Sequence, residues 1–348
     1  MYIREGDFIE TKDNLFFDVK GYDHPRNRII AFLRYYPDRR GDRIKNYQKY
    51  QKVYSLNKRY DILKTQFPHY LYKDETINQI IQAIPINYIK KIYYPHEYLE
   101  RILKKKKTND YEKQVLEFVS FFIKYVKIFV YDIGVSGSPM IGLNKYDSDI
   151  DLIIYGKNNA LKVYNALDML FDAKDIPITR YTENELKGLY DFKSKDTDIS
   201  WEKFYEFEKK KKTQGKFKDT DFFIRFVKAW DDIEGDNRFK YGYFSYKTIG
   251  KATIEAKITN DDEFCFTPCC YEINNIKYKD IKIFGEKSQR DIEKVKINEI
   301  VSYRGRFTEA RKNEIVHARG NIELVKGKNK EEYLRLIVGN EKEDFLYT

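Results

Sequence analysis

Asp149 and Asp151 are the residues in this sequence with the clearest capacity for chemistry, because they lie one residue apart inside the apolar stretch Asp149-Ile-Asp-Leu-Ile-Ile-Tyr155. Side chains alternate between the faces of a strand, so both carboxylates project from one face while the intervening aliphatic residues point into a core. Two like charges held together raise a pKa or recruit a cation. Carboxylate oxygens suit Mg²⁺ or Mn²⁺. The pair therefore predicts a metal site, although an Asp-x-Asp alone is equally typical of a solvated edge strand.

A second pattern lies upstream of the two aspartates. Residues 128–135 have the composition of a strand and lead into Gly137-Ser138, and ten residues lie between Ser138 and Asp149. A glycine lets a phosphate approach the backbone closely, and the adjacent serine adds a hydroxyl. A Gly-Ser dipeptide by itself is an ordinary turn. The ordered combination of strand, Gly-Ser, spacer and Asp-x-Asp predicts a site that holds phosphate and metal together.

With these residues in this order, the sequence resembles the DNA polymerase β-type nucleotidyltransferase superfamily over residues 115–156. The resemblance implies that Asp149 and Asp151 bind Mg²⁺ or Mn²⁺ and that Gly137 and Ser138 bind an NTP. Ile141 occupies the position at which many members that act on small molecules carry arginine. The motif sequence is therefore more similar to that of RNA-terminal transferases. The chain is also similar to an uncharacterised group of archaeal predicted nucleotidyltransferases.

The same resemblance implies a third carboxylate on a neighbouring strand, as the base for the attacking hydroxyl. Glu255 lies within the strand-like alternation of residues 252–258, and Asp221 opens the apolar run of residues 221–227. Either could be an ordinary surface carboxylate. We choose Glu255 as the third catalytic residue, because a position inside a strand would aim it at the aspartate pair if the two strands adjoin; Asp221 is the alternative.

The charge distribution indicates a nucleic-acid partner. The chain has 65 Lys and Arg against 55 Asp and Glu, a net charge of +10. Basic residues crowd the segment from 26 to 60, where they alternate with Tyr35, Tyr36, Tyr47, Tyr50 and Tyr54. Cations neutralise phosphates and tyrosine rings can stack on unpaired bases, so we predict that this segment binds RNA. The alternative is that the tyrosines pack a small core.

The overall composition indicates a cytoplasmic protein. The N-terminus MYIREGDFIE has no apolar targeting segment, and the most apolar stretch is interrupted by charges, which predicts no membrane partner. Only Cys265, Cys269 and Cys270 are present, and we interpret them as buried structural thiols in a reducing compartment.

The predicted fold class is α+β: a polymerase β-like core of mixed sheet and helices, flanked by an N-terminal α/β extension and a small C-terminal β domain. Strands are predicted near 14–21 and 28–36, followed by short helices to about 105. A helix begins near Asn109 or Asp110, another covers 158–173, and strands dominate after 221, forming a small barrel or sandwich. These patterns predict three domains, at residues 1–108, 109–260 and 261–348.

Three functions follow from these patterns. The first is transfer of a nucleotide to an RNA 3′ end, using NTP and a divalent metal. The second is nucleotide transfer to a small molecule or to a protein hydroxyl. The third is a catalytically silent protein that binds RNA. The basic segment favours the first over the second, and the intact Asp-x-Asp favours both over the third.

Overall fold

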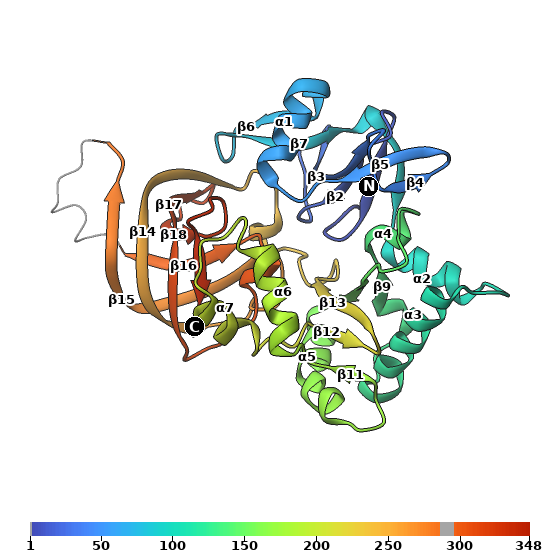
Figure 1. Ribbon diagram of the computed structural model, residues 1–348. Helices are drawn as coiled ribbons and strands as arrows, with labels where there is room; N and C mark the ends of the chain where they lie inside the picture. The colour runs from blue at the N-terminus through green and yellow to red at the C-terminus, as the bar shows by residue number, and fades with distance from the viewer. Residues whose placement is uncertain (1, 286–295) are drawn as a thin grey trace. The chain divides into compact units, whose positions relative to one another are not determined.

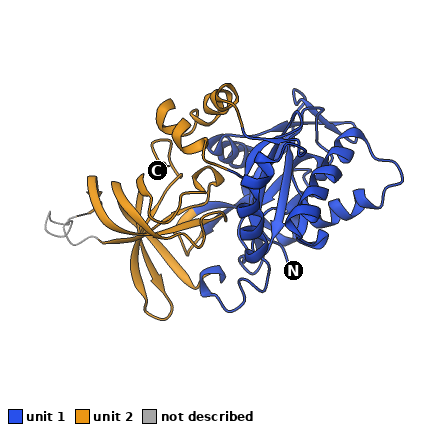
Figure 2. Cartoon of the chain, turned by 90° about the horizontal axis from the view of Figure 1, so that it is seen from below, with its two compact units in different colours: residues 1–73, 80–180, 212–241 blue, residues 74–79, 181–211, 242–348 orange. Residues whose placement is uncertain are grey.

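The computed structural model describes residues 2–285 and 296–348, which fold as an α+β protein with several sheets and, within those residues, seven α-helices. The chain divides into two compact units, coloured separately in Figure 2. Unit 1 consists of residues 1–73, 80–180 and 212–241. Unit 2 consists of residues 74–79, 181–211 and 242–348.

The N-terminal part of the chain forms an eight-stranded sheet, drawn mainly in blue in Figure 1. Its strands are β1 (Phe8–Thr11), β2 (Phe16–Val19), β3 (Arg28–Pro37), β4 (Arg43–Lys45), β5 (Gln48–Lys52), β6 (Leu71–Asp74), β7 (Gln79–Pro85) and β8 (Ile89–Tyr93). Six of them run in the order β4-β5-β3-β2-β1-β8, and β7 joins β3 to β6. Alternate residues of β3 pack with Phe17 and with Leu63 of helix α1 (Leu56–Gln66) in one apolar core.

The strands predicted near 14–21 and 28–36 are confirmed as β2 and β3. The prediction of short helices up to residue 105 is wrong for residues 71–93, which form β6, β7 and β8. Helix α2 (Pro95–Leu103) follows, and Pro95 packs so closely on Gly134 that a Cβ at Gly134 would lie 2.7 Å from the Cβ of Pro95. Any larger side chain at position 134 would therefore clash with Pro95.

A second sheet within unit 1 carries the Asp-x-Asp motif. Its strands are β9 (Ile133–Val135), β10 (Ile150–Tyr155), β11 (Ile178–Thr179), β12 (Gln214–Phe217) and β13 (Thr220–Val227), in the order β11-β12-β13-β10-β9. Strands β10 and β13 are parallel and the other neighbours are antiparallel. Helices α3 (Asp110–Phe121) and α5 (Lys157–Asp172) cover one face, where Phe118 and Phe171 meet Phe222 at ring distances of 4.9 and 6.4 Å.

Both helices that flank this sheet were predicted. Asn109 caps α3 in a capping box, accepting from the amide of Glu112 at 2.8 Å while the Glu112 carboxylate accepts from the Asn109 amide. Helix α5 occupies 157–172, close to the predicted 158–173. The strand predicted over 128–135 is shorter, because Lys127 has a left-handed backbone with φ of 59° and a 3₁₀ turn precedes β9.

In its described residues, unit 2 contains a closed sheet and two α-helices. The strands are β14 (Phe244–Asn260), β15 (Cys269–Ile283), β16 (Ile297–Ser302), β17 (Ile315–Gly327), β18 (Glu332–Ile337) and β19 (Phe345–Tyr347). The sheet order is β14-β15-β16-β18-β17-β19, and β14 also pairs with β17, which closes five strands into a ring. The prediction of a strand-rich C-terminal region that forms a small barrel or sandwich is confirmed as the closed form, which also includes β14, before residue 261. Helices α6 (Glu183–Lys193) and α7 (Trp201–Glu208) belong to the same unit.

The division into units differs from the three predicted domains. Residue 108 lies inside unit 1, because the N-terminal segment bonds directly to the second sheet. The hydroxyl of Ser136 donates to the carbonyl of Gly6 at 2.8 Å, and the guanidinium of Arg225 lies 3.2 Å from the carboxylate of Glu5. The boundary predicted at residue 260 coincides with the end of β14, inside unit 2.

None of the helices described in this structure combines the length and the apolar character that crossing a lipid bilayer requires.

Candidate functional site

The Asp-x-Asp motif lies at the start of strand β10 and in the residues just before it. Ile150, Leu152 and Ile154 are fully buried on the helix-covered face, as the alternation predicts. Asp151 therefore projects from the opposite face. Asp149 precedes the strand and is exposed, and its carbonyl accepts a hydrogen bond from the hydroxyl of Tyr111 at 3.1 Å. The two residues differ in environment, since Asp149 is exposed and Asp151 is half-buried.

A small cavity of about 70 Å³ brings the motif residues together within unit 1. Its lining includes all four residues predicted to bind metal and nucleotide, together with residues of β2, β3, β5 and β13. The lining residues are Phe8, Asp18, Arg34, Tyr35, Lys52, Ser136, Gly137, Ser138, Asp149, Asp151 and Arg225.

Gly137 is required by its contact with Asp151. Its backbone has φ of +78°, a conformation that L side chains rarely adopt. A Cβ at this position would overlap Oδ2 of Asp151 and lie 3.1 Å from its Cγ. The glycine of the Gly-Ser dipeptide therefore lets the backbone pass directly beside this half-buried carboxylate.

Ser138 is connected to the Asp-x-Asp segment by a side-chain contact. Its Oγ lies 3.2 Å from Oγ of Ser148, which accepts from the backbone amide of Lys145 at 2.8 Å. Ser138 is only 4% exposed, and its carbonyl accepts from the amide of Leu143 at 2.9 Å. These bonds connect the loop before Asp149 to the Gly-Ser turn and fix the position of the turn relative to the aspartates.

The electrostatics of the cavity centre on Asp151. Burial raises its pKa to about 7, and the neighbouring Asp149 acts in the same direction, while Arg225, Lys52 and Arg34 oppose both. A carboxyl group with a pKa of about 7 is partly protonated at neutral pH unless a bound cation takes the place of the proton. A cation beside Asp151 would therefore stabilise its ionised form.

Two charged residues in the cavity escaped the sequence analysis. Asp18, in Phe-Phe-Asp-Val of β2, and Arg225, in Phe-Ile-Arg-Phe of β13, are each embedded in an apolar strand, the same signal that identifies Asp151. Burial raises the pKa of Asp18, but Lys20, Arg225 and Arg34 outweigh it and lower the pKa to about 2. Asp18 is thus a third carboxylate in the cavity, and it is ionised.

The polar atoms of Asp18 and Arg34 leave bonding capacity in the cavity. Oδ2 of Asp18 accepts from Nζ of Lys20 at 2.8 Å, whereas Oδ1 is buried without a hydrogen bond and lies 3.6 Å from Nη1 of Arg225. Nε of Arg34 is also buried without a hydrogen bond. Buried polar atoms of this kind are uncommon and indicate a ligand or water.

The residue predicted as the third catalytic acid, Glu255, lies on a different sheet. Its choice depended on the two strands adjoining, but β14 pairs with β15 and β17, and β10 pairs with β9 and β13. The Glu255 carboxylate lies 2.8 Å from Nζ of Lys277 and 3.2 Å from Nζ of Lys279, and these bonds lower its pKa to about 2. The expectation that the strand of Glu255 adjoins the strand of the aspartate pair is therefore wrong.

The alternative acid, Asp221, does lie on the strand beside β10. Phe223 of β13 is paired with Asp151, so Asp221 shares the face of the aspartates. Its side chain is 54% exposed, lies 3.4 Å from Nζ of Lys216, and is outside the cavity lining.

The positions of Asp18, Glu255 and Asp221 predict different effects when each of these acids is replaced by its amide. We expect Asp18→Asn to reduce kcat roughly 10- to 100-fold, because Asp18 positions Arg225 beside Asp151. Glu255→Gln and Asp221→Asn should leave kcat unchanged. Steady-state kinetics on folded variants, with thermal unfolding as the control for Asp18→Asn, separate the cases. A strong loss at Glu255 with none at Asp18 would restore the original assignment.

The pKa of Asp151 also predicts a stability effect in metal-free buffer. The ordinary pKa is 3.8 and the folded-state value is about 7, so the folded protein holds this proton more tightly and loses that stability as the pH rises from about 4 to about 7. Asp151→Asn should then exceed the wild type in unfolding free energy above pH 7, by up to about 4 kcal/mol. Urea unfolding at pH 4 and pH 8 measures this, and a difference that is independent of pH would contradict it.

The basic, tyrosine-rich segment is only partly a surface. Tyr35, Tyr36 and Tyr50 are at most 8% exposed, and Tyr36 belongs to the apolar core of the N-terminal sheet. Base stacking was wrongly predicted for these three because their rings are buried, Tyr36 in that core and Tyr35 on the other face of β3, at the cavity. Tyr47 and Tyr54 are exposed.

The arginines of this segment also divide into two sets. Arg34 lines the cavity and Arg43 donates to the carbonyl of Leu143 at 2.6 Å. Arg39 and Arg40 are exposed at the surface.

The cysteines have structural positions. Cys265 and Cys269 are buried, Cys270 is half-buried, and burial raises the pKa of Cys269 to about 12. Within residues 2–285 and 296–348, no cluster of three or more His, Cys, Asp or Glu side chains is arranged to hold a metal ion. A metal at the cavity would therefore depend on Asp149 and Asp151 with non-protein ligands.

By its fold, the protein is an α+β protein of two compact units, and the cavity in unit 1 is lined by both aspartates of the Asp-x-Asp motif. The chain is 33% identical, over 99% of its own length and 98% of the relative's, to the uncharacterised protein MJ1086 of the archaeon Methanocaldococcus jannaschii. It belongs to the same family as this archaeal protein, in agreement with the predicted archaeal group. No family model matches the chain. No solved structure matches it either.

Proposed function

We propose that the protein is a metal-dependent nucleotidyltransferase with a polymerase β-like core, which transfers NMP from an NTP to a hydroxyl at an RNA 3′ end. The observation that carries this proposal is the cavity that unites Gly137 and Ser138 with Asp149 and Asp151. The Gly-Ser pair and the two aspartates come from two separate parts of the motif, and in the proposal each has a role in one reaction. The residues of the surrounding sheet add positive charge suited to a triphosphate.

The residues present fit a divalent cation. Two carboxylates are the usual protein contribution to a Mg²⁺ site, with water and substrate phosphate as the remaining ligands. The raised pKa of Asp151 indicates that the cavity gains stability from a cation near this carboxylate. When bound, Mg²⁺ or Mn²⁺ would neutralise the charge of the triphosphate and polarise its α-phosphate. Asp149 and Asp151 would hold the ion.

The remaining residues position the phosphates. Ser138 and the backbone of Gly137 approach the triphosphate, and Lys52 and Arg34 supply cations in the lining of the same cavity. The acceptor hydroxyl oxygen attacks the α-phosphorus, the bond from that phosphorus to the β-phosphate oxygen breaks, and pyrophosphate leaves. The hydroxyl proton passes to a carboxylate or to solvent. Arg225, held by Asp18 and Glu5, keeps positive charge beside Asp151.

The choice of acceptor is tested by supplying several. The purified protein is incubated with Mg²⁺ or Mn²⁺, each labelled NTP separately, and either total RNA, a mixture of small hydroxyl compounds or protein alone. Labelled RNA is the expected product. Label on a small compound or on protein would favour the second function, and no label in any mixture would favour a silent RNA-binding protein.

Exposed arginines near the cavity provide a prediction about RNA affinity. Arg39 and Arg40 lie on the loop after β3, and replacing both by Gln should weaken RNA binding and make its salt dependence shallower by about 0.7 log-log units per lost contact. The matched control is Lys162→Gln with Lys174→Gln, two exposed lysines at α5 and just beyond it. Filter binding across a salt series measures both slopes. Equal slopes for the two variants would assign the arginines to ordinary solvated surface.

A further inference from the structure

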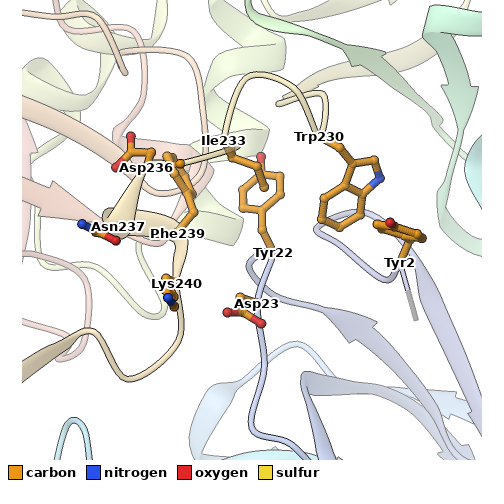
Figure 3. Close-up of a pocket in the computed structure, with 10 residues that line it drawn as sticks. Tyr2, Tyr22, Asp23, Trp230, Ile233, Asp236, Asn237, Phe239 and Lys240 are labelled. Atoms are coloured by element: carbon orange, nitrogen blue, oxygen red, sulfur yellow. The ribbon is translucent and has the colours of Figure 1, made fainter.

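An open pocket of about 410 Å³ within unit 1 is lined by aromatic rings (Figure 3). Tyr2 and Trp230 meet edge to face with ring centres 5.3 Å apart, and Tyr22 and Phe239 meet in the same way at 5.4 Å. In Figure 3 Tyr22 lies between Phe239 and Trp230. The volume falls in the range of small-molecule sites. No role in the proposed reaction has been given to any of these rings.

The pocket is built on the strands that carry the aspartate cavity. Tyr22 packs in one cluster with Ile153, Tyr155 and Val227, and Trp230 and Phe239 pack against that cluster. Ile153 and Tyr155 belong to β10, which begins with the aspartates. Tyr155 follows Asp151 by four positions, or about 13 Å along a strand. A nucleic-acid chain with a rise of roughly 3.4 Å per nucleotide covers this distance in a few nucleotides.

The charges around the rings favour a neutral occupant. The guanidinium of Arg4 lies 5.2 Å from the Trp230 ring centre and 4.2 Å from that of Tyr155, and Nζ of Lys228 lies 5.3 Å from the Phe239 ring centre. The faces that would attract a ligand cation therefore already have cations of the protein beside them. A flat uncharged ring can still stack on the exposed parts of Tyr2 and Trp230.

The rim of the pocket offers hydrogen bonds to the edge of such a ring. Asn237 is exposed and has both a donor and an acceptor in its side chain. Asp23 is fixed by amides, since its carboxylate accepts from the backbone of His24 and of Tyr241 at 2.9 Å each. A carboxylate has further lone pairs after two such bonds.

We propose that this pocket binds a nucleobase, stacked on an exposed ring at its Tyr2–Trp230 end and hydrogen-bonded at its edge to the rim carboxylate of Asp23. The inference rests on the proposed function for the source of the base, which is either the RNA acceptor or the NTP. Stacking between bases and aromatic side chains is the common means of holding unpaired nucleotides.

The experiment uses Trp230 as its own reporter. The chain has two tryptophans, so Trp201→Phe leaves Trp230 as the sole one. Its fluorescence is titrated, without divalent metal, with a short oligoribonucleotide, with each NTP and with tetramethylammonium. Saturable quenching by a nucleotide is expected, and the stronger of the first two ligands identifies the source. Quenching by tetramethylammonium alone, or by none of the ligands, would overturn the proposal.

A side-chain truncation at the pocket tests the location. Tyr2 is 77% exposed, so Tyr2→Ala should keep the fold and weaken nucleotide binding roughly tenfold. Tyr131→Ala, at an 85% exposed tyrosine outside the pocket, is the matched control and should bind as before. Equal affinity in both variants would contradict the site. If the wild-type protein transfers no nucleotide while nucleotides still quench Trp230, the proposed reaction fails and the nucleobase site stands.

Discussion

Asp149→Asn and Asp151→Asn are each expected to abolish nucleotide transfer while the protein remains folded. Each change removes a carboxylate that we propose as a ligand of the divalent cation and keeps the side-chain volume, so the proposed ion would lose one of its two protein ligands. Transfer is measured with labelled NTP and RNA at saturating Mg²⁺ and Mn²⁺, alongside circular dichroism and thermal unfolding. Full activity in either folded variant would remove that residue from catalysis.

The matched control for this pair is Asp147→Asn. Asp147 is exposed in the same loop, two residues before Asp149, and lies outside the cavity lining. The Asp147→Asn substitution removes one negative charge from the same loop. A general effect of charge on RNA binding would therefore appear in this variant too. We expect its activity to equal that of the wild type.

Gly137→Ala is the second change with a large expected effect. The new Cβ would overlap the Asp151 carboxylate, so either the carboxylate or the Gly-Ser turn must shift by an appreciable fraction of an ångström. Displacements of this size at reacting groups cost roughly 100-fold in rate. The left-handed backbone adds about 1–2 kcal/mol of destabilisation. Kinetics and urea unfolding measure the two effects separately.

Gly21→Ala separates backbone strain from the clash. Gly21 has φ of +80°, almost the same as Gly137, but a Cβ there would meet nothing within 4 Å. Both variants should therefore lose similar stability, and only Gly137→Ala should lose transfer. Equal activity in the two variants would show that the contact with Asp151 is unimportant for the reaction.

Local patterns predicted the elements around the site well. The alternation around Asp151 placed its aliphatic neighbours in the core, and the Asn109 cap and the helix at 157–172 follow from short-range signals. Each of these depends on residues close in sequence. Hydrogen bonding at the helix start and alternation along a strand act within a few residues, so sequence shows them directly.

The partners of the motif were not predictable in the same way. Asp18 and Arg225 meet because β2 and β13 lie on either side of one cavity, although 206 residues separate them in the chain. Each could be recognised as a charge embedded in an apolar strand, but its partner depends on tertiary contacts. Glu255 shows the converse, because a strand pattern alone does not tell which sheet the strand joins.

The tyrosines illustrate a further limit of composition. Basic residues alternating with tyrosines are typical both of an RNA-binding surface and of a strand with one buried face. In β3 and β5 the second applies, and the rings of Tyr35 and Tyr50 belong to the buried side. The exposed cations Arg39 and Arg40 lie in the loop after β3, where alternation has ended.

The position of the label in the NTP tests nucleotidyl transfer most directly. The purified protein is incubated with RNA, Mn²⁺ and ATP, CTP, GTP or UTP labelled at either the α- or the γ-phosphate. We predict that α-label enters the RNA, that γ-label is released as pyrophosphate, and that Asp151→Asn does neither. Transfer of γ-label to the acceptor, or equal incorporation of α-label by wild type and Asp151→Asn, would contradict nucleotidyl transfer at the aspartate pair.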